Sequence, residues 1–175
     1  MSDPDFERLL EKDKYQVFLF ACPAGMPASF ATHPWFVVNR TGTISRYGIS
    51  WRTAAQGDRP PFARHTCGKC VGHLHKDALP SAVGIEMFFF IRGWMWESRL
   101  LGSVTGGEGS LAARMADVIE RSLETYPYIE RYSLIGPNSN TYPQWVVNQF
   151  PESGLRLPWN AFGKRYVMSR TSVNS

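Results

Sequence analysis

The sequence contains little cysteine, no long apolar run and no basic start. Its three cysteines cannot form a fully paired disulfide framework, so we expect a reducing compartment and a cytoplasmic location. The longest apolar run, residues 83–96, contains Glu86 and Arg92 and is shorter than a membrane span requires. Residues 1–14 are acidic and lack the basic region of a signal peptide. We therefore expect no membrane partner.

Acidic residues are also scarce over two stretches, so the net charge of +4 is unevenly spread. Residues 39–76 hold seven Lys or Arg against one acid, and residues 156–175 hold four against none. A basic face can attract phosphates or nucleic acid, but a solvated surface is the commoner explanation. We accordingly do not expect nucleic acid as a partner, and a small molecule or a peptide is left as the candidate ligand.

The sequence lacks repeats, low-complexity segments and an interdomain linker, so we expect one domain over residues 1–175. Apolar patterns typical of strands cover residues 15–21, 34–40, 43–51, 85–91, 97–105 and 165–168. Thr41-Gly42 suits a tight turn between the second and third of these strands, and a turn near Gly93 separates the fourth and fifth. The mixture predicts an α+β fold with a mainly antiparallel sheet flanked by two helices.

Two helices are predicted in the second half of the chain. Ser110 can cap the first, which ends at Tyr126-Pro127. The second begins near Ser139 to Asn140, because Pro143 is tolerated only in a first turn. A short helix over residues 3–12 is also predicted.

Small polar residues open the second of these helices, in the run Gly136-Pro137-Asn138-Ser139-Asn140-Thr141. A helix start presents unpaired N–H groups and a positive dipole end, which suit an anion or a nucleophile. His33 stands at the start of a predicted strand, where it could act as a general base. We therefore predict a cleft between His33 and the Asn138–Thr141 turn. His33, Ser139 and Asn140 are its catalytic candidates, and Asn138, Thr141 and Trp35 its ligand-binding candidates.

A structural interpretation of the same run needs no reaction. One polar side chain can cap the helix, and the others must find partners elsewhere because buried amides without hydrogen bonds are costly. This interpretation predicts that at least one amide reaches the loop before His33 or the tail at residues 160–164. His33 would then bond loop carbonyls and lie near the motif without acting as a base.

A second group of chemistry-bearing residues lies within residues 65–75. His65, Cys67, Cys70, His73 and His75 make up this group. Cys-x-x-Cys can present two thiolates to one zinc ion, and a nearby histidine can complete the site, so Cys67, Cys70, His73 and His75 are candidate metal ligands. The two-plus-two spacing of a zinc finger is absent, and x-His-x-Leu-His equally suits a strand with both imidazoles on one face. We expect no cofactor, with zinc as the alternative.

Several of these pieces resemble the family called domain of unknown function 3750. The most specific is Gly136-Pro137-Asn138-Ser139-Asn140-Thr141, and the others are Phe20-Ala21-Cys22-Pro23, His33-Pro34-Trp35-Phe36, Tyr126-Pro127-Tyr128 and Pro158-Trp159-Asn160-Ala161-Phe162-Gly163-Lys164. Their order and spacing cover nearly the whole chain. That family has no assigned reaction, so the resemblance implies one domain and says little about chemistry.

A more distant resemblance is to circularly permuted NlpC-type papain-fold proteins. In those proteins a histidine on an early strand precedes a cysteine on a late helix, and His33 matches the histidine by order. The position that matches the cysteine is Asn140 or Ser139, which argues against a cysteine peptidase. The resemblance implies a permuted papain-like arrangement with either a binding-only cleft or an unusual Ser-based amide or ester hydrolase. The alternative function, from the residues alone, is a metal-stabilised interaction module built on His65 to His75.

Overall fold

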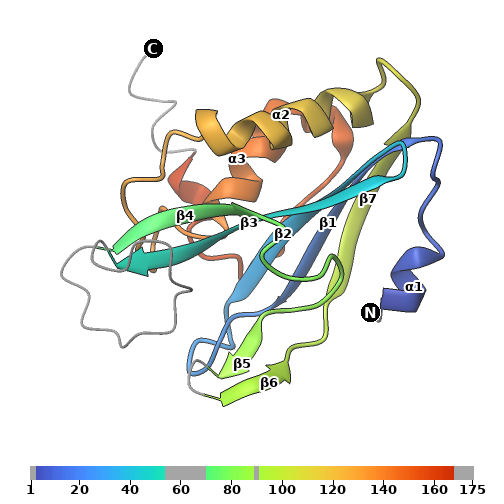
Figure 1. Cartoon of the computed structure of the whole chain (residues 1–175). Coiled ribbons are helices and arrows are strands. Elements are labelled where there is room, and N and C mark those ends of the chain that lie inside the picture. The colour runs from blue at the N-terminus through green and yellow to red at the C-terminus, as the bar shows by residue number, and fades with distance from the viewer. Residues whose placement is uncertain (1–2, 54–69, 89–90, 168–175) are drawn as a thin grey trace, which may run out of the picture.

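A five-stranded antiparallel sheet forms the centre of the computed structural model, which describes residues 3–53, 70–88 and 91–167 (Figure 1). Its strand order is β4-β3-β2-β1-β7. The strands of this sheet are β1 (Tyr15–Pro23), β2 (Thr32–Arg40), β3 (Thr43–Thr53), β4 (Cys70–Lys76) and β7 (Arg99–Gly106). A separate two-stranded sheet consists of β5 (Glu86–Phe88) and β6 (Ile91–Met95). Each of β1 to β4 therefore pairs with its neighbour in sequence, and β7 returns beside β1.

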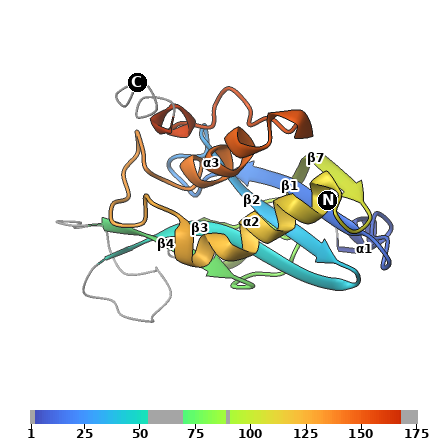
Figure 2. The ribbon, with the colours of Figure 1, turned by 90° about the horizontal axis from the view of Figure 1, so that it is seen from above.

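The helices are α1 (Asp3–Glu7), α2 (Leu111–Thr125) and α3 (Thr141–Gln149), with 3-10 turns η1 (Pro151–Ser153) and η2 (Lys164–Tyr166). In the view from above, α2 crosses the strands with α3 beside it (Figure 2). The hydroxyl of Ser110 accepts a hydrogen bond from the Ala113 N–H at 3.3 Å, which is the cap predicted for α2. None of the helices in the described ranges is long and apolar enough to cross a membrane.

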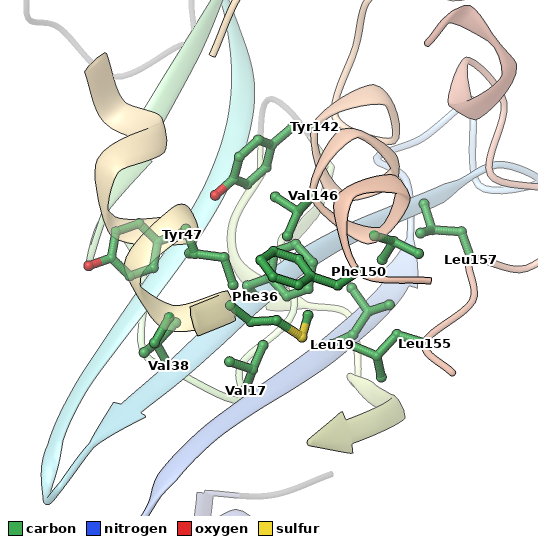
Figure 3. Close-up of a cluster of buried hydrophobic side chains, with 14 of the residues drawn as sticks. Val17, Leu19, Phe36, Val38, Tyr47, Tyr142, Val146, Phe150, Leu155 and Leu157 are labelled. Atoms are coloured by element: carbon green, nitrogen blue, oxygen red, sulfur yellow. The ribbon is translucent and has the colours of Figure 1, made fainter. Parts of the chain in front are cut away.

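The larger core lies between one face of the sheet and the helices α2 and α3. Side chains from alternate positions of β1, β2 and β3 meet side chains from α3 and the segment after it: Val17, Leu19, Phe36, Val38, Tyr47, Tyr142, Val146, Phe150, Leu155 and Leu157 (Figure 3). Tyr142 packs edge-on against Phe36, with ring centroids 6.1 Å apart, and its hydroxyl bonds that of Ser122 at 2.9 Å. The polar end of Tyr142 is therefore satisfied inside the core.

A smaller core covers the opposite face of the sheet. Its buried members are Phe6, Phe18, Phe20, Cys22, Trp35, Val37 and Ala82. Because both faces of β1 and β2 are buried, these strands have near-continuous apolar runs and no polar alternation. The sequence pattern consequently locates the two strands without showing which of their residues face the helices.

Most predicted elements are confirmed, including the antiparallel sheet, the Thr41-Gly42 turn, α2 and α3. The short N-terminal helix ends at Glu7, earlier than predicted, because the buried Gln16 bonds backbone groups that a longer helix would need. The Gln16 side chain accepts a hydrogen bond from the Glu11 N–H at 2.8 Å and donates one to the Leu9 carbonyl at 2.9 Å.

Two further predictions are wrong in detail. Gly93 does not lie in a turn between strands, since it sits inside β6 with a φ of 87°. The strand expected over residues 165–168 is not found in its described part, residues 165–167, and residue 168 lies outside the described residues. In that part η2 ends, and Tyr166 packs edge-on against Tyr128 at 5.5 Å. Tertiary packing of that ring outweighs the local strand preference.

The core predicts a clear contrast between two positions of α2. Ile119 is fully buried, whereas Leu123, one turn later, is 45% exposed. Ile119→Ala should lower the free energy of unfolding by about 2–5 kcal/mol because it leaves a cavity. Leu123→Ala should change that free energy by less than about 0.5 kcal/mol. Urea unfolding of both variants checks this, and equal losses would contradict the assignment of the buried face.

Candidate functional site

The start of α3 is held by hydrogen bonds within the Asn138–Thr141 turn. Asn140 occupies the cap position, but its side chain makes no capping bond. Instead, the Asn138 Oδ1 accepts from the Asn140 N–H at 3.0 Å, and the Asn138 N–H donates to the Thr141 Oγ1 at 3.0 Å. The helix thus starts where the sequence predicts, but the side chain that accepts a backbone N–H at its start belongs to Asn138 and not to the cap residue Asn140.

The side-chain donors of the turn reach two other segments, whereas the buried Asn140 Oδ1 has no hydrogen-bond partner among the described residues. Asn138 Nδ2 donates to the carbonyls of Ser133 and Leu134 at 3.2 and 3.0 Å. Asn140 Nδ2 donates to the Phe162 carbonyl at 2.9 Å, and Thr141 Oγ1 to the Gly163 carbonyl at 3.0 Å. The expectation that an amide of this motif bonds the tail at residues 160–164 is therefore confirmed.

Gly163 shows how closely these segments approach. Its φ of 90° is rarely adopted by other residues, and a Cβ there would lie 2.4 Å from Asn138 Nδ2. Only glycine therefore lets the tail pass this close to the helix start.

Ser139 is engaged on the same side of the sheet. Its hydroxyl and its backbone N–H both hydrogen-bond the Tyr132 side chain. Burial raises the pKa of Tyr132, and the two bonds from Ser139 oppose that rise. A serine hydroxyl held in this way has a structural partner, and no base is found beside it among the described residues.

His33 lies on the other face of the sheet. Side chains alternate along a strand, and Phe36 faces α3 while Trp35 belongs to the smaller core on the opposite face. His33 shares the side of Trp35, with ring centroids 6.4 Å apart. The expected cleft between His33 and the Asn138–Thr141 turn is therefore not formed, and His33 and Trp35 do not join Ser139 and Asn140 in one site.

The link between the two regions runs through Thr32, the neighbour of His33. Its N–H and its hydroxyl donate to the backbone and side-chain oxygens of Asn160, at 3.2 and 2.8 Å. The tail thus touches β2 on one side and the helix start on the other. This arrangement ties α3 to the sheet without placing an imidazole beside it.

The face that carries His33 holds a buried arginine. Arg46 is 1% exposed, and its guanidinium stacks over the Trp35 ring at 4.0 Å. Its Nη1 donates to the carbonyls of Pro80, at 2.7 Å, and Val83. No ion pair with a carboxylate is found for this guanidinium among the described residues, and its buried Nε has no hydrogen-bond partner there. Burial lowers the pKa of Arg46 to about 10, which leaves the group charged at neutral pH.

Two histidines and a thiol surround this cation. Burial lowers the pKa of His33 to about 3, with further contributions from the charges of Arg46 and His75. Gly48 pairs with His75, and a Cβ on Gly48 would lie 3.3 Å from the imidazole Cε1. The missing side chain at this position lets the His75 ring lie next to Trp35.

The thiol belongs to Cys22, which pairs with His33 across the two strands. Its Sγ contacts the His33 carbonyl at 3.9 Å, and burial raises the thiol pKa to about 11. At neutral pH the thiol is protonated and the imidazole is neutral. This pair therefore lacks the thiolate that a cysteine nucleophile requires.

The candidate metal ligands fall only partly within the described ranges. His65 and Cys67 lie outside them, and Cys70 is described only by its backbone at the start of β4. His73 and His75 share one face of β4, with ring centroids 5.9 Å apart. Residues 3–53, 70–88 and 91–167 contain no group of three or more His, Cys, Asp or Glu that could hold a metal. Zinc binding through Cys67 and Cys70 stays a prediction.

Comparison with known proteins identifies the family. A family model described as "Protein of unknown function (DUF3750)" matches residues 14–166. The chain belongs to the DUF3750 family. No curated protein and no solved structure matches it. The DUF3750 resemblance is confirmed, whereas the papain-like arrangement gains no support from these comparisons.

Two residues of this DUF3750 chain were missed as site candidates. Arg46 and Cys22 look unremarkable in sequence, because each sits alone in a strand pattern. Their importance depends on the second face of the sheet being covered, and the pattern of β1 and β2 does not indicate which side chains meet there. One feature of the sequence does indicate the position of Arg46. Because side chains alternate along a strand, Arg46 and Gly48 must point to the face of the sheet opposite to that of the core residues Tyr47 and Ile49.

The hydrogen bonds of Asn138 predict a stability loss larger than that of a helix cap. Asn138→Ala removes four side-chain bonds and leaves the buried Asn140 N–H unsatisfied, so the free energy of unfolding should fall by more than about 2 kcal/mol. A lone cap contributes about 1 kcal/mol. Asn148→Ala is the control, since its side chain is exposed and bonds Gln144 at the surface. The melting temperatures of the two variants are compared with that of the wild type. A wild-type melting temperature for Asn138→Ala would rule out the structural role.

The buried His33 predicts a dependence of stability on pH. Its pKa is about 3 in the folded chain against 6.5 in the unfolded chain, so only the unfolded chain binds this proton between those values. Stability should therefore fall as the pH drops from about 6.5 towards 3, by about 2 kcal/mol at pH 5 from this group. His33→Gln should remove that part of the slope. Chemical unfolding of both proteins across this range measures it, with pH 8 as the internal control. Parallel curves would contradict the buried, neutral state of His33.

Proposed function

We propose that this DUF3750 chain is a binding domain without turnover, whose ligand is a small molecule carrying a carboxylate or phosphate group. The ligand is held on the sheet face away from α2 and α3, by Arg46 with His33 and His75 beside it. One observation carries the proposal: a fully buried guanidinium with no carboxylate partner among the described residues.

Burying an unpaired cation costs several kcal/mol, even in a protein interior that relaxes. Stacking on Trp35 and the carbonyls of Pro80 and Val83 offset part of that cost for Arg46. None of these groups carries a full negative charge. An anion that accepts a hydrogen bond from the unpartnered Nε would supply one, and a guanidinium suits carboxylate and phosphate groups in particular.

The neighbouring groups favour binding over hydrolysis. His33 is neutral and Cys22 is a protonated thiol, so neither adds a negative charge that would repel an anion. The same protonation states leave no activated nucleophile on this face. Ser139 lies on the other face and bonds Tyr132. His75, which is partly exposed, marks the side from which a ligand would approach.

Nuclear magnetic resonance of the histidine rings tests this proposal, with inorganic phosphate and acetate as probes. An anion beside Arg46 should raise the pKa of His33 from about 3, because the positive potential there is reduced. Arg46→Met, which keeps an apolar stem, should abolish the response. Arg40→Met is the matched control, since Arg40 pairs at the surface with Asp117 and Glu120.

Unchanged His33 signals at saturating phosphate and acetate would refute the site, as would an equal response in Arg46→Met. If that variant does not fold, Arg46→Lys keeps the charge but loses the planar fork, and it should bind at least about tenfold more weakly. A separate assay addresses turnover. Hydrolysis of an activated ester that is lost in a folded His33→Ala variant would show that the domain is an enzyme.

A further inference from the structure

Large apolar side chains project into solvent from three loops near the start of α3. They are Phe30, Leu134, Ile135, Trp159 and Phe162, which together we call the apolar loop surface. Leu134, Ile135 and Trp159 are each more than 80% exposed. Single exposed apolar residues are common on proteins, but several on adjacent loops indicate an interaction site.

Hydrogen bonds of Asn138, Asn140 and Asn160 bring these three loops together. Asn138 holds the carbonyl of Leu134, and Asn140 holds the carbonyl of Phe162. Asn160 Nδ2 donates to the Phe30 carbonyl at 3.0 Å, and the rings of Phe30 and Phe162 lie 6.0 Å apart. The backbone at Leu134 and at Phe162 is therefore fixed by the buried amides of Asn138 and Asn140, and Asn160 holds the backbone at Phe30.

The same loops carry an excess of positive charge. Residues 24–31, 126–137 and 154–167 contain four cations, Arg131, Arg156, Lys164 and Arg165, against one acid, Glu130. Arg131 also donates a hydrogen bond to the Tyr166 hydroxyl at 3.3 Å. This bond joins the loop of residues 126–137 to that of residues 154–167. Tryptophan, phenylalanine and leucine beside lysine and arginine match the chemistry of proteins that lie on a bilayer surface.

We propose that the apolar loop surface docks on an anionic membrane surface. Its apolar side chains enter the boundary between headgroups and acyl chains, while the exposed Arg131, Arg156 and Arg165 face the lipid phosphates. The Lys164 ammonium donates to the carbonyls of Leu157 and Pro158, so it contributes charge without a direct lipid contact. The expectation of no membrane partner considered only a spanning segment, and surface docking needs none. The charge favours an anionic bilayer over a second copy of this chain, because the cations around the apolar patch would repel the same surface of another copy.

Co-sedimentation of the full chain with vesicles tests the proposal. The chain should bind vesicles that contain phosphatidylglycerol and phosphatidylcholine, bind pure phosphatidylcholine far less, and be released by salt. Trp159→Ser and the double variant Leu134→Ser, Ile135→Ser should each weaken binding at least about tenfold. Both leave the fold intact because these side chains are exposed.

Trp94→Ser is the matched control. This tryptophan is also exposed, but it lies on β6, away from α2 and α3 (Figure 1). It should bind anionic vesicles like the wild type. Absence of binding to phosphatidylglycerol vesicles overturns the proposal, and so does an equal loss in Trp94→Ser. Concentration-dependent dimerisation that Trp159→Ser abolishes, without vesicle binding, would assign the surface to a second copy instead.

Discussion

Burial of both faces of β2 is the constraint on which the rest of this structure depends. Phe36 and Val38 close the core beneath α2 and α3, while Trp35 and Val37 close the smaller core on the opposite face. A strand in this position has no solvent side, so each of its side chains needs a partner layer. The second layer is held by Arg46, which stacks on Trp35 and binds the carbonyls of the segment before β5. His33 is buried as a consequence and loses its charge.

The Asn138–Thr141 turn lies on the other side of the sheet. Asn138 and Asn140 donate their side-chain N–H groups, and Thr141 its hydroxyl, to backbone carbonyls of the loop before α3 and of the tail after it. Buried amides bonded to carbonyls fix loop conformation more firmly than apolar contacts, because an unmade bond there is costly. The Asn138–Thr141 turn is therefore explained as the support of two neighbouring loops, and its small polar residues do not require a reaction.

Much of the fold could be predicted from sequence, because its signals are local. Ser110 and Pro143 locate two helix starts, and Thr41-Gly42 locates a hairpin. The candidate site could not be predicted, because its assembly depends on which face of β2 meets the helices. Both faces of β2 are apolar, so the sequence pattern does not show whether His33 or Phe36 points towards the helices. Assigning the faces one residue out of step would exchange the two sets of side chains. The partners of Arg46 come from residues 80–83, whose path over the sheet has no local signal.

The central claim is that His33 and the Asn138–Thr141 turn lie on opposite faces of the sheet. Nuclear Overhauser contacts of the His33 ring protons measure this most directly in the intact chain. The structure predicts contacts from that ring to the side chain of Trp35, and none to Ser139 or Asn140. A contact between the His33 ring and Ser139 would contradict the arrangement and restore a shared site of imidazole and helix start.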